Sequence, residues 1–203
     1  MMLQNAILAI ALSLQPVWYK PGKAPETPEQ YRERLGTIAA AIAAEVELAE
    51  GWGFSKEALA AATLATWYAE SRLSYEVHTG SGRTRHGEDQ GRARCLGQVH
   101  RVWAPKGEWK RLAGTDLEAT RRCAATTMKV LIAQSKRCRL KQEPGVWSLA
   151  RVFAAYMNGL KCEPTKASLK RARHWAKLMK QLEEPQVGVA ASGAAAPTTA
   201  RLD

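Results

Sequence analysis

The chain of 203 residues lacks the features that mark several common protein classes. It has two phenylalanines, no Cys-x-x-Cys or His-x-x-x-His spacing, and no internal repeat at solenoid periods. Its nine-residue apolar run, residues 6–14, is too short to cross a bilayer as a helix. We therefore expect no transmembrane helix, no zinc site, no other metal and no cofactor.

The same run is long enough for the core of an export signal, but no Lys or Arg precedes it and no small-x-small cleavage site follows. An export segment and a buried N-terminal helix both remain open. We divide the chain into an apolar segment with a Pro-rich linker (residues 1–28), one domain (residues 29–184) and a disordered tail rich in Ala, Pro and Thr (residues 185–203).

Apolar residues make up 46% of the chain and recur at steps of three and four, which is typical of amphipathic helices. Capping residues indicate four helix starts, at Thr27, Ser55, Thr115 and Thr165. Another helix begins near Val146 and ends at Gly159. We predict an all-α or mostly α domain of five or six helices, with long loops and few or no strands.

The last predicted helix has an apolar face and a basic face. Its inward residues are predicted to be Leu169, Ala172, Ala176 and Met179. Its outward residues are predicted to be Lys166, Lys170, Arg173, Lys177 and Lys180.

Residues 78–93 contain four glycines and many charges and predict a long surface loop without a core element. A functional loop and a tolerated insertion are both compatible with this composition. The net charge of +11 is compatible with an anionic partner, although a solvated basic surface is the commoner explanation of such a charge. We find no zinc, homeodomain or RNA-recognition signature.

Glu70 follows the apolar helical segment that ends in Trp67-Tyr68-Ala69. Burial disfavours the charged form of a carboxyl group and raises its pKa, which suits a general acid. A solvated, inert Glu-Ser pair at a helix end is the competing interpretation.

Three segments carry a family resemblance: residues 70–73 (Glu-Ser-Arg-Leu), 94–98 (Arg-Cys-Leu-Gly-Gln) and 154–159 (Ala-Ala-Tyr-Met-Asn-Gly). They resemble, in the family's order, the Glu-Ser, Gly-Leu-Met-Gln and Ala-Tyr-Asn-x-Gly signatures of the lysozyme-like lytic transglycosylases. The match covers about half of the chain. Cys95 and Gly97 stand where the family has Gly and Met, and Met157 stands where it usually has Asn.

The resemblance implies a lysozyme-like helical domain that cleaves the β-1,4 bond between N-acetylmuramic acid and N-acetylglucosamine in peptidoglycan. Glu70 would act as general acid and then as base, giving a 1,6-anhydro product. Substrate contacts would come from Ser71, Gln98, Tyr156 and Asn158. Structural roles remain open for three of these: Tyr156 as a core residue, Gln98 as a backbone cap and Ser71 as a helix terminator.

The resemblance implies that the partner is the glycan strand of peptidoglycan, with no dedicated nucleic-acid partner. It also implies a monomer that acts outside the cytoplasm, as a periplasmic, secreted or virion-associated protein. It would be encoded by a bacterium, a phage or a prophage. A second carboxylate from Glu76, Glu88 or Asp89 would instead permit hydrolysis. From another class, a non-catalytic basic helical module would bind the cell wall, a phage structure or nucleic acid.

The four cysteines are expected to form disulfides in an oxidising compartment. Cys123 and Cys138 would lie about 22 Å apart on one continuous helix, too far to bond. If the next helix folds back antiparallel, Cys162 comes near Cys123. We therefore predict a Cys123–Cys162 pair.

Overall fold

The structure is a computed structural model that describes residues 2–14, 24–53, 55–81, 93–139, 145–159 and 161–183. The predicted fold class is confirmed, because helices dominate the described chain and its strands form one short antiparallel pair. The α-helices are α1 (Met2–Ser13), α2 (Pro28–Leu48), α3 (Lys56–Ser71), α4 (Tyr75–Thr79), α5 (Leu117–Arg137), α6 (Val146–Asn158) and α7 (Lys166–Glu183). The strands are β1 (Ala93–Arg94) and β2 (Val99–His100), followed by the short 3-10 helices η1 (Arg101–Trp103) and η2 (Trp109–Leu112).

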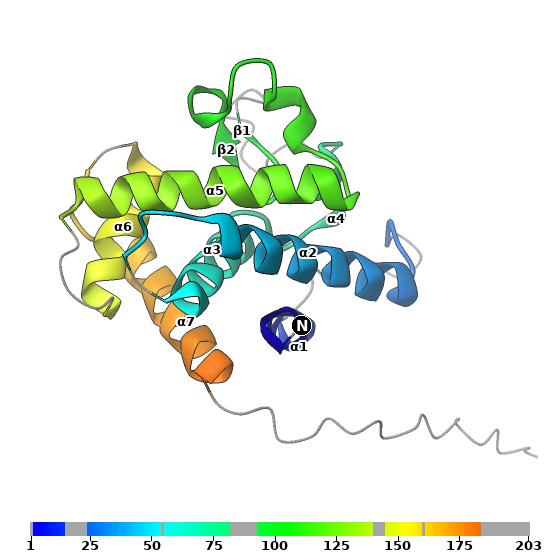
Figure 1. The fold of residues 1–203 in the computed structure, drawn as a ribbon, viewed down its shortest axis with the longest axis horizontal. Helices are drawn as coiled ribbons and strands as arrows, with labels where there is room; N and C mark the ends of the chain where they lie inside the picture. Colours follow the sequence, from blue (N-terminus) through cyan, green and yellow to red (C-terminus); the bar gives the residue numbers. More distant parts are fainter. Residues whose placement is uncertain are drawn as a thin grey trace, which may run out of the picture.

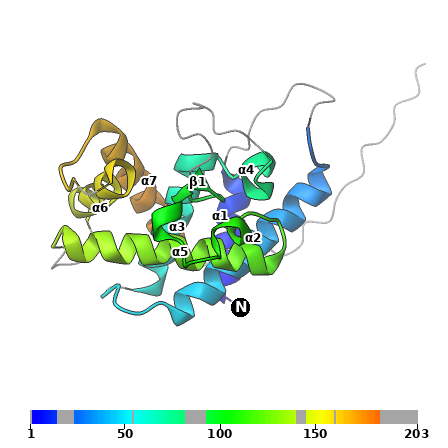
Figure 2. The ribbon, with the colours of Figure 1, turned by 90° about the horizontal axis from the view of Figure 1, so that it is seen from above.

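Helix α3 lies at the centre of the domain, and α1, α2, α5 and α7 all pack against it (Figure 1). Every residue from 58 to 67 is buried. Five of these ten positions are alanine, whose small side chain lets neighbouring helices approach closely on all sides. Seen from above, α5 runs along one side of the domain, with α6 and α7 at one end (Figure 2).

The apolar N-terminal run forms α1, which packs mainly on α2. Its buried residues are Ala6, Ile7, Ile10 and Ala11, so one face of the helix belongs to the hydrophobic core. Among the helices of the described residues, none has both the length and the apolar character needed to span a membrane.

The predicted helix boundaries are largely confirmed, with one correction. Thr27 and Gln30 form a capping box, and Ser55 accepts a hydrogen bond from the Ala58 amide. The cap of α5 is Asp116 and not Thr115: its carboxylate accepts from the Ala119 amide at 2.9 Å. With Asp116 as the cap, Ala119 takes the third helical position, and the Glu118 side chain pairs with Arg122.

The predicted Cys123–Cys162 pairing is wrong. The disulfides are Cys95–Cys123 and Cys138–Cys162, with Cα atoms 6.1 and 5.5 Å apart. Helix α6 packs across the C-terminal end of α5 and does not run back along it, because the sulfur of Cys138 lies 3.6 Å from the Arg151 carbonyl oxygen. The chain after α6 therefore returns to Cys138, and Cys123 is left facing the β-hairpin.

The predicted loop over residues 78–93 is corrected at both ends. His78 belongs to α4, where it is fully buried, and Ala93 and Arg94 form β1. Ser74 explains the first difference, because its hydroxyl caps α4 at the Val77 amide. Residues 82–92, which include Glu88 and Asp89, lie outside the described residues, as do residues 20–23 of the predicted linker (residues 20–28) and the predicted tail (residues 185–203).

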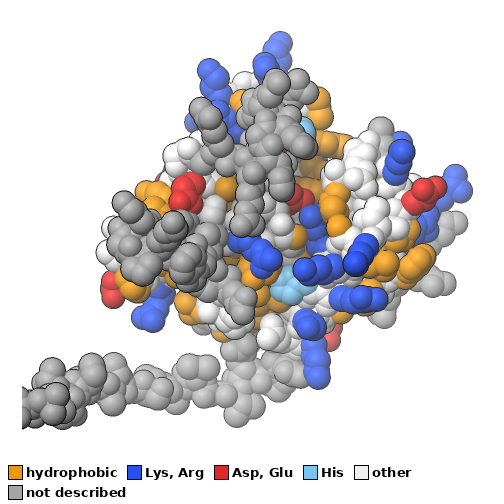
Figure 3. Space-filling view, turned by 180° about the vertical axis from the view of Figure 1, so that it is seen from behind, with side chains coloured by type: hydrophobic (Ala, Val, Ile, Leu, Met, Phe, Trp, Pro, Cys, Tyr) orange, Lys and Arg blue, Asp and Glu red, His pale blue; other side chains and the backbone are white. Residues whose placement is uncertain are grey.

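The five predicted outward cations of α7 are exposed, but its buried face is centred about one position earlier than predicted. The buried residues are Ser168, Arg171, Ala172, Trp175 and Leu178. Trp175 sets this rotation, since its indole N–H donates to the Ala58 carbonyl of α3 at 3.1 Å. Lys and Arg side chains gather near the middle of the face shown in Figure 3.

Candidate active site

Glu70 lies in the last turn of α3, where the side chain is 23% exposed. The helix ends there because Arg72 and Leu73 both adopt left-handed backbone angles, each with φ of 54°. The dry, apolar surroundings expected for the carboxylate are not what the structure has. Oε1 of Glu70 instead accepts a hydrogen bond from Nη2 of Arg171 at 2.8 Å.

Arg171 is the site residue that the sequence analysis missed. Its side chain is only 6% exposed, and its guanidinium carbon lies 5.7 Å from the centre of the Phe153 ring. Nε and Nη1 have no hydrogen-bond partner among the described residues. The sequence does hold one indication of this role. Arg171 stands three residues after Ser168 and four before Trp175, and this spacing places a cation on the buried face of α7.

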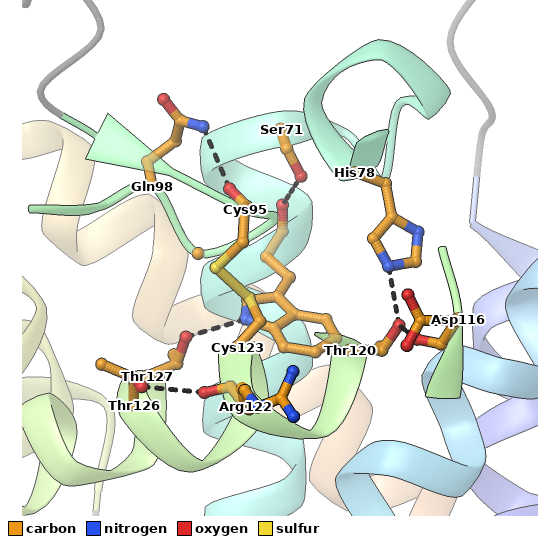
Figure 4. The surroundings of a disulfide bond; sticks show 12 residues. Ser71, His78, Cys95, Gln98, Asp116, Thr120, Arg122, Cys123, Thr126 and Thr127 are labelled. Atoms are coloured by element: carbon orange, nitrogen blue, oxygen red, sulfur yellow. Dashed lines mark hydrogen bonds between the residues drawn. A yellow bond between two sulfur atoms is a disulfide. The ribbon is translucent and has the colours of Figure 1, made fainter. Parts of the chain in front are cut away.

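The second matched segment forms the tight turn between β1 and β2. The backbone N–H of Gln98 donates to the Cys95 carbonyl at 2.9 Å. The side-chain Nε2 of Gln98 donates to the same oxygen at 3.0 Å (Figure 4). Gln98 therefore caps its own turn in this structure. The Cys95–Cys123 disulfide ties the turn to α5.

Gly97 lies in the most closely packed part of the site. A Cβ atom at this position would overlap the Thr127 hydroxyl and lie 3.1 Å from Nε1 of Trp67. Trp67 and Thr127 are themselves joined by a buried hydrogen bond of 3.0 Å. The turn can therefore approach α3 and α5 this closely only because residue 97 has no side chain.

Tyr156, from the third matched segment, connects α6 to the turn. Its hydroxyl donates to the Gly97 carbonyl at 2.6 Å. Burial raises the pKa of Tyr156, and the negative charge of Glu70 raises it further, while Arg171 and Thr127 act in the opposite direction. The phenol is therefore a neutral hydrogen-bond donor at physiological pH.

The other two predicted site residues lie apart from this arrangement. The Ser71 hydroxyl donates to the Trp67 carbonyl at 2.7 Å and accepts from the Leu73 amide, so it helps to end α3 (Figure 4). Asn158 is exposed at the last position of α6. The structure thus brings Glu70, Tyr156 and the Cys95–Gln98 turn together, and it adds Arg171.

The described ranges contain no group of three or more His, Cys, Asp and Glu side chains placed to hold a metal ion. Comparisons of the chain with protein-family models, with curated proteins and with solved structures found no match. The chemistry available at the site is that of one carboxylate that can exchange a proton, held beside a fixed cation and a neutral phenol.

Proposed function

We propose that the protein cleaves peptidoglycan at the β-1,4 bond between N-acetylmuramic acid and N-acetylglucosamine, as a lytic transglycosylase with Glu70 as its acid and base. One observation carries this proposal. Three segments that resemble the family's signatures are far apart in sequence, and they converge on the end of α3 through the Tyr156–Gly97 hydrogen bond and the packing of Gly97 on Trp67.

In the proposed reaction, protonated Glu70 gives its proton to the glycosidic oxygen as the bond from that oxygen to C1 of the muramoyl residue breaks. The same carboxylate then removes the proton of the muramoyl 6-hydroxyl, whose oxygen bonds to C1. No water is consumed, and the product is a 1,6-anhydro sugar. Proton donation requires that substrate entry separates the carboxylate from Arg171, because a guanidinium stabilises the charged partner.

Two alternatives to the transglycosylase proposal are distinguished by the same experiments. A hydrolase would need a second carboxylate opposite Glu70, and the described candidate is Glu76 in α4. A non-catalytic basic module is favoured by the Glu70–Arg171 ion pair, which occupies the one carboxylate that the mechanism requires.

The test compares muropeptide release from purified sacculi by the wild type and by Glu70→Gln. Glutamine keeps an amide oxygen that can accept from Arg171, so the variant is suited to remain folded, and its thermal unfolding checks this. Glu57→Gln, at the opposite end of α3, removes the same charge as a matched control. We expect the wild type and the control to release muropeptides. The rate of release by Glu70→Gln should be lower by about 10²-fold or more.

Mass spectrometry of the released products then decides the reaction type. Anhydro sugars support the transglycosylase proposal, and reducing ends replace it with the hydrolase. Equal release by Glu70→Gln and the wild type, or no release by a folded wild type, would overturn the enzymatic proposal.

A further inference from the structure

Four cations form a single stripe along the exposed side of α7. Lys166, Lys170, Arg173 and Lys177 follow one another at steps of four, three and four residues, which places them one above another on a helix. All four are exposed. We call this set the α7 basic face.

No acidic residue that the structure describes neutralises the α7 basic face. Within the described part of the chain, none of its four members makes an ion pair, and the only acidic residue of α7 is Glu183 at its end. Like charges three and four residues apart on a helix repel and destabilise it. An anion bound along the stripe would remove that repulsion.

The histidine beside the stripe responds to the same positive field. Burial lowers the pKa of His174, and the positive charges of Lys177 and Arg72 lower it further. His174 lies against the Tyr68 ring, with ring centroids 5.2 Å apart, and the guanidinium carbon of the exposed Arg72 lies 4.7 Å from the centre of the same ring.

Two contacts link α7 to the end of α3 that carries Glu70, and both are made by residues that flank the α7 basic face. Arg171, next to Lys170 in the chain, reaches inward to Glu70, and Tyr68, which contacts His174, precedes Glu70 by two residues on α3. Lys177 and Arg72 both act on His174, so His174 and Tyr68 connect the stripe to the helix end that carries Glu70. In peptidoglycan, the muramoyl residue next to the bond to be cut carries a peptide stem with free carboxylates.

We propose that the α7 basic face binds the carboxylates of the peptide stems on the glycan strand held at Glu70. The proposal rests on the proposed function for the identity of the strand. It makes the protein selective for glycan that still bears its peptides, because stripped glycan presents no anion to the stripe.

The test measures binding separately from cleavage. Full-length Glu70→Gln protein is co-sedimented with sacculi freed of accessory anionic polymers, and with the same glycan after an amidase has removed its peptides. The charge-reversal variant Lys170→Glu/Arg173→Glu is compared with Lys110→Glu/Lys129→Glu, which makes the same change in net charge at exposed lysines of η2 and α5. Thermal unfolding of each variant confirms that it is folded.

We expect the α7 variant to bind intact sacculi about tenfold more weakly than the η2/α5 control does. The protein with an unchanged stripe should bind stripped glycan about as weakly as the α7 variant binds intact sacculi. Equal binding by the two variants, or equal binding to intact and stripped glycan, would overturn the proposal. So would duplex DNA or a phosphate-rich wall polymer that binds the stripe at physiological salt more tightly than intact sacculi do. Because the assay uses a cleavage-blocked protein, it gives an answer even where the wild type releases no muropeptides.

Discussion

Nη2 of Arg171 lies 2.8 Å from Oε1 of Glu70, although the two residues are 101 positions apart in the chain. The pair joins the C-terminal end of α3 to the buried face of α7, and the cation is the more buried partner. A buried charge that loses its partner is costly, whereas removing both partners costs much less. The two side chains therefore depend on each other in the folded protein, and removing either one leaves the other charge uncompensated.

This relationship predicts strong coupling between the two side chains in a double-mutant cycle. Glu70→Gln and Arg171→Met should each lower the free energy of unfolding by about 1–3 kcal/mol, and the double variant should lose less than their sum, with a coupling of about 1–2 kcal/mol. Urea unfolding of the four proteins measures it. Costs that add within about 0.5 kcal/mol would show that the pair is not a stabilising unit.

Gly97→Ala should disrupt the candidate site by overpacking. The added methyl meets the Thr127 hydroxyl, Trp67 Nε1 and the Tyr156 hydroxyl, so we expect a loss of about 1–3 kcal/mol in the free energy of unfolding. Thermal unfolding followed by tryptophan fluorescence measures the loss. Gly36→Ala in α2 is the matched control: it has open space around the new methyl and should be neutral or slightly stabilising. Unchanged stability of Gly97→Ala would contradict the packing described for the turn.

His78 should make the protein less stable as the pH falls. Burial is the main cause that lowers the pKa of His78 to about 3, and the charge of Arg34 lowers it further, while Asp116 opposes both. The Thr120 hydroxyl donates its hydrogen to the backbone carbonyl of Asp116, so it can only accept from His78. The hydrogen in the 2.9 Å bond between His78 and Thr120 is therefore on Nε2 of His78. The buried imidazole is therefore neutral in the folded protein.

The unfolded chain takes up a proton on His78 near pH 6.5, and the folded protein does so only near pH 3. The stabilising contribution of the neutral ring is thus complete above pH 6.5 and is lost between pH 6.5 and about 3, by as much as ~5 kcal/mol. Denaturant unfolding at several pH values should show a weaker pH dependence in His78→Gln than in the wild type. His100→Gln, at an exposed position of β2, should retain the wild-type slope.

The disulfide pattern can be mapped directly. Lys and Arg residues separate all four cysteines, so a non-reducing tryptic digest should yield one linked peptide for Cys95–Cys123 and another for Cys138–Cys162. Removing the first bond with Cys95→Ala/Cys123→Ala should cost about 3.5 kcal/mol, as expected for a closed loop of 28 residues. A Cys123–Cys162 peptide in the native protein would contradict the packing of α6 described above.

Local signals determined most of what the sequence alone could predict. The helical class, the caps at Thr27, Ser55 and Thr165, and the end of α6 at Gly159 follow from interactions within a few residues of each position. The position of Glu70 at the end of a buried helix is also a local property. The outward cations of α7 could be predicted because apolar residues that recur at steps of three and four define the buried face of a helix, and the charged residues between them lie outward.

Tertiary packing decided the rest, because it depends on how helices cross. The angle of α6 across the end of α5 selected the disulfide partners, and the rotation of α7 imposed by Trp175 turned Arg171 inward to Glu70. Neither the partner of a carboxylate 101 residues away nor the space available at Gly97 is encoded in any short segment. The sequence determined where the carboxylate stands in its helix, and only the packed structure decided that a buried cation meets it there.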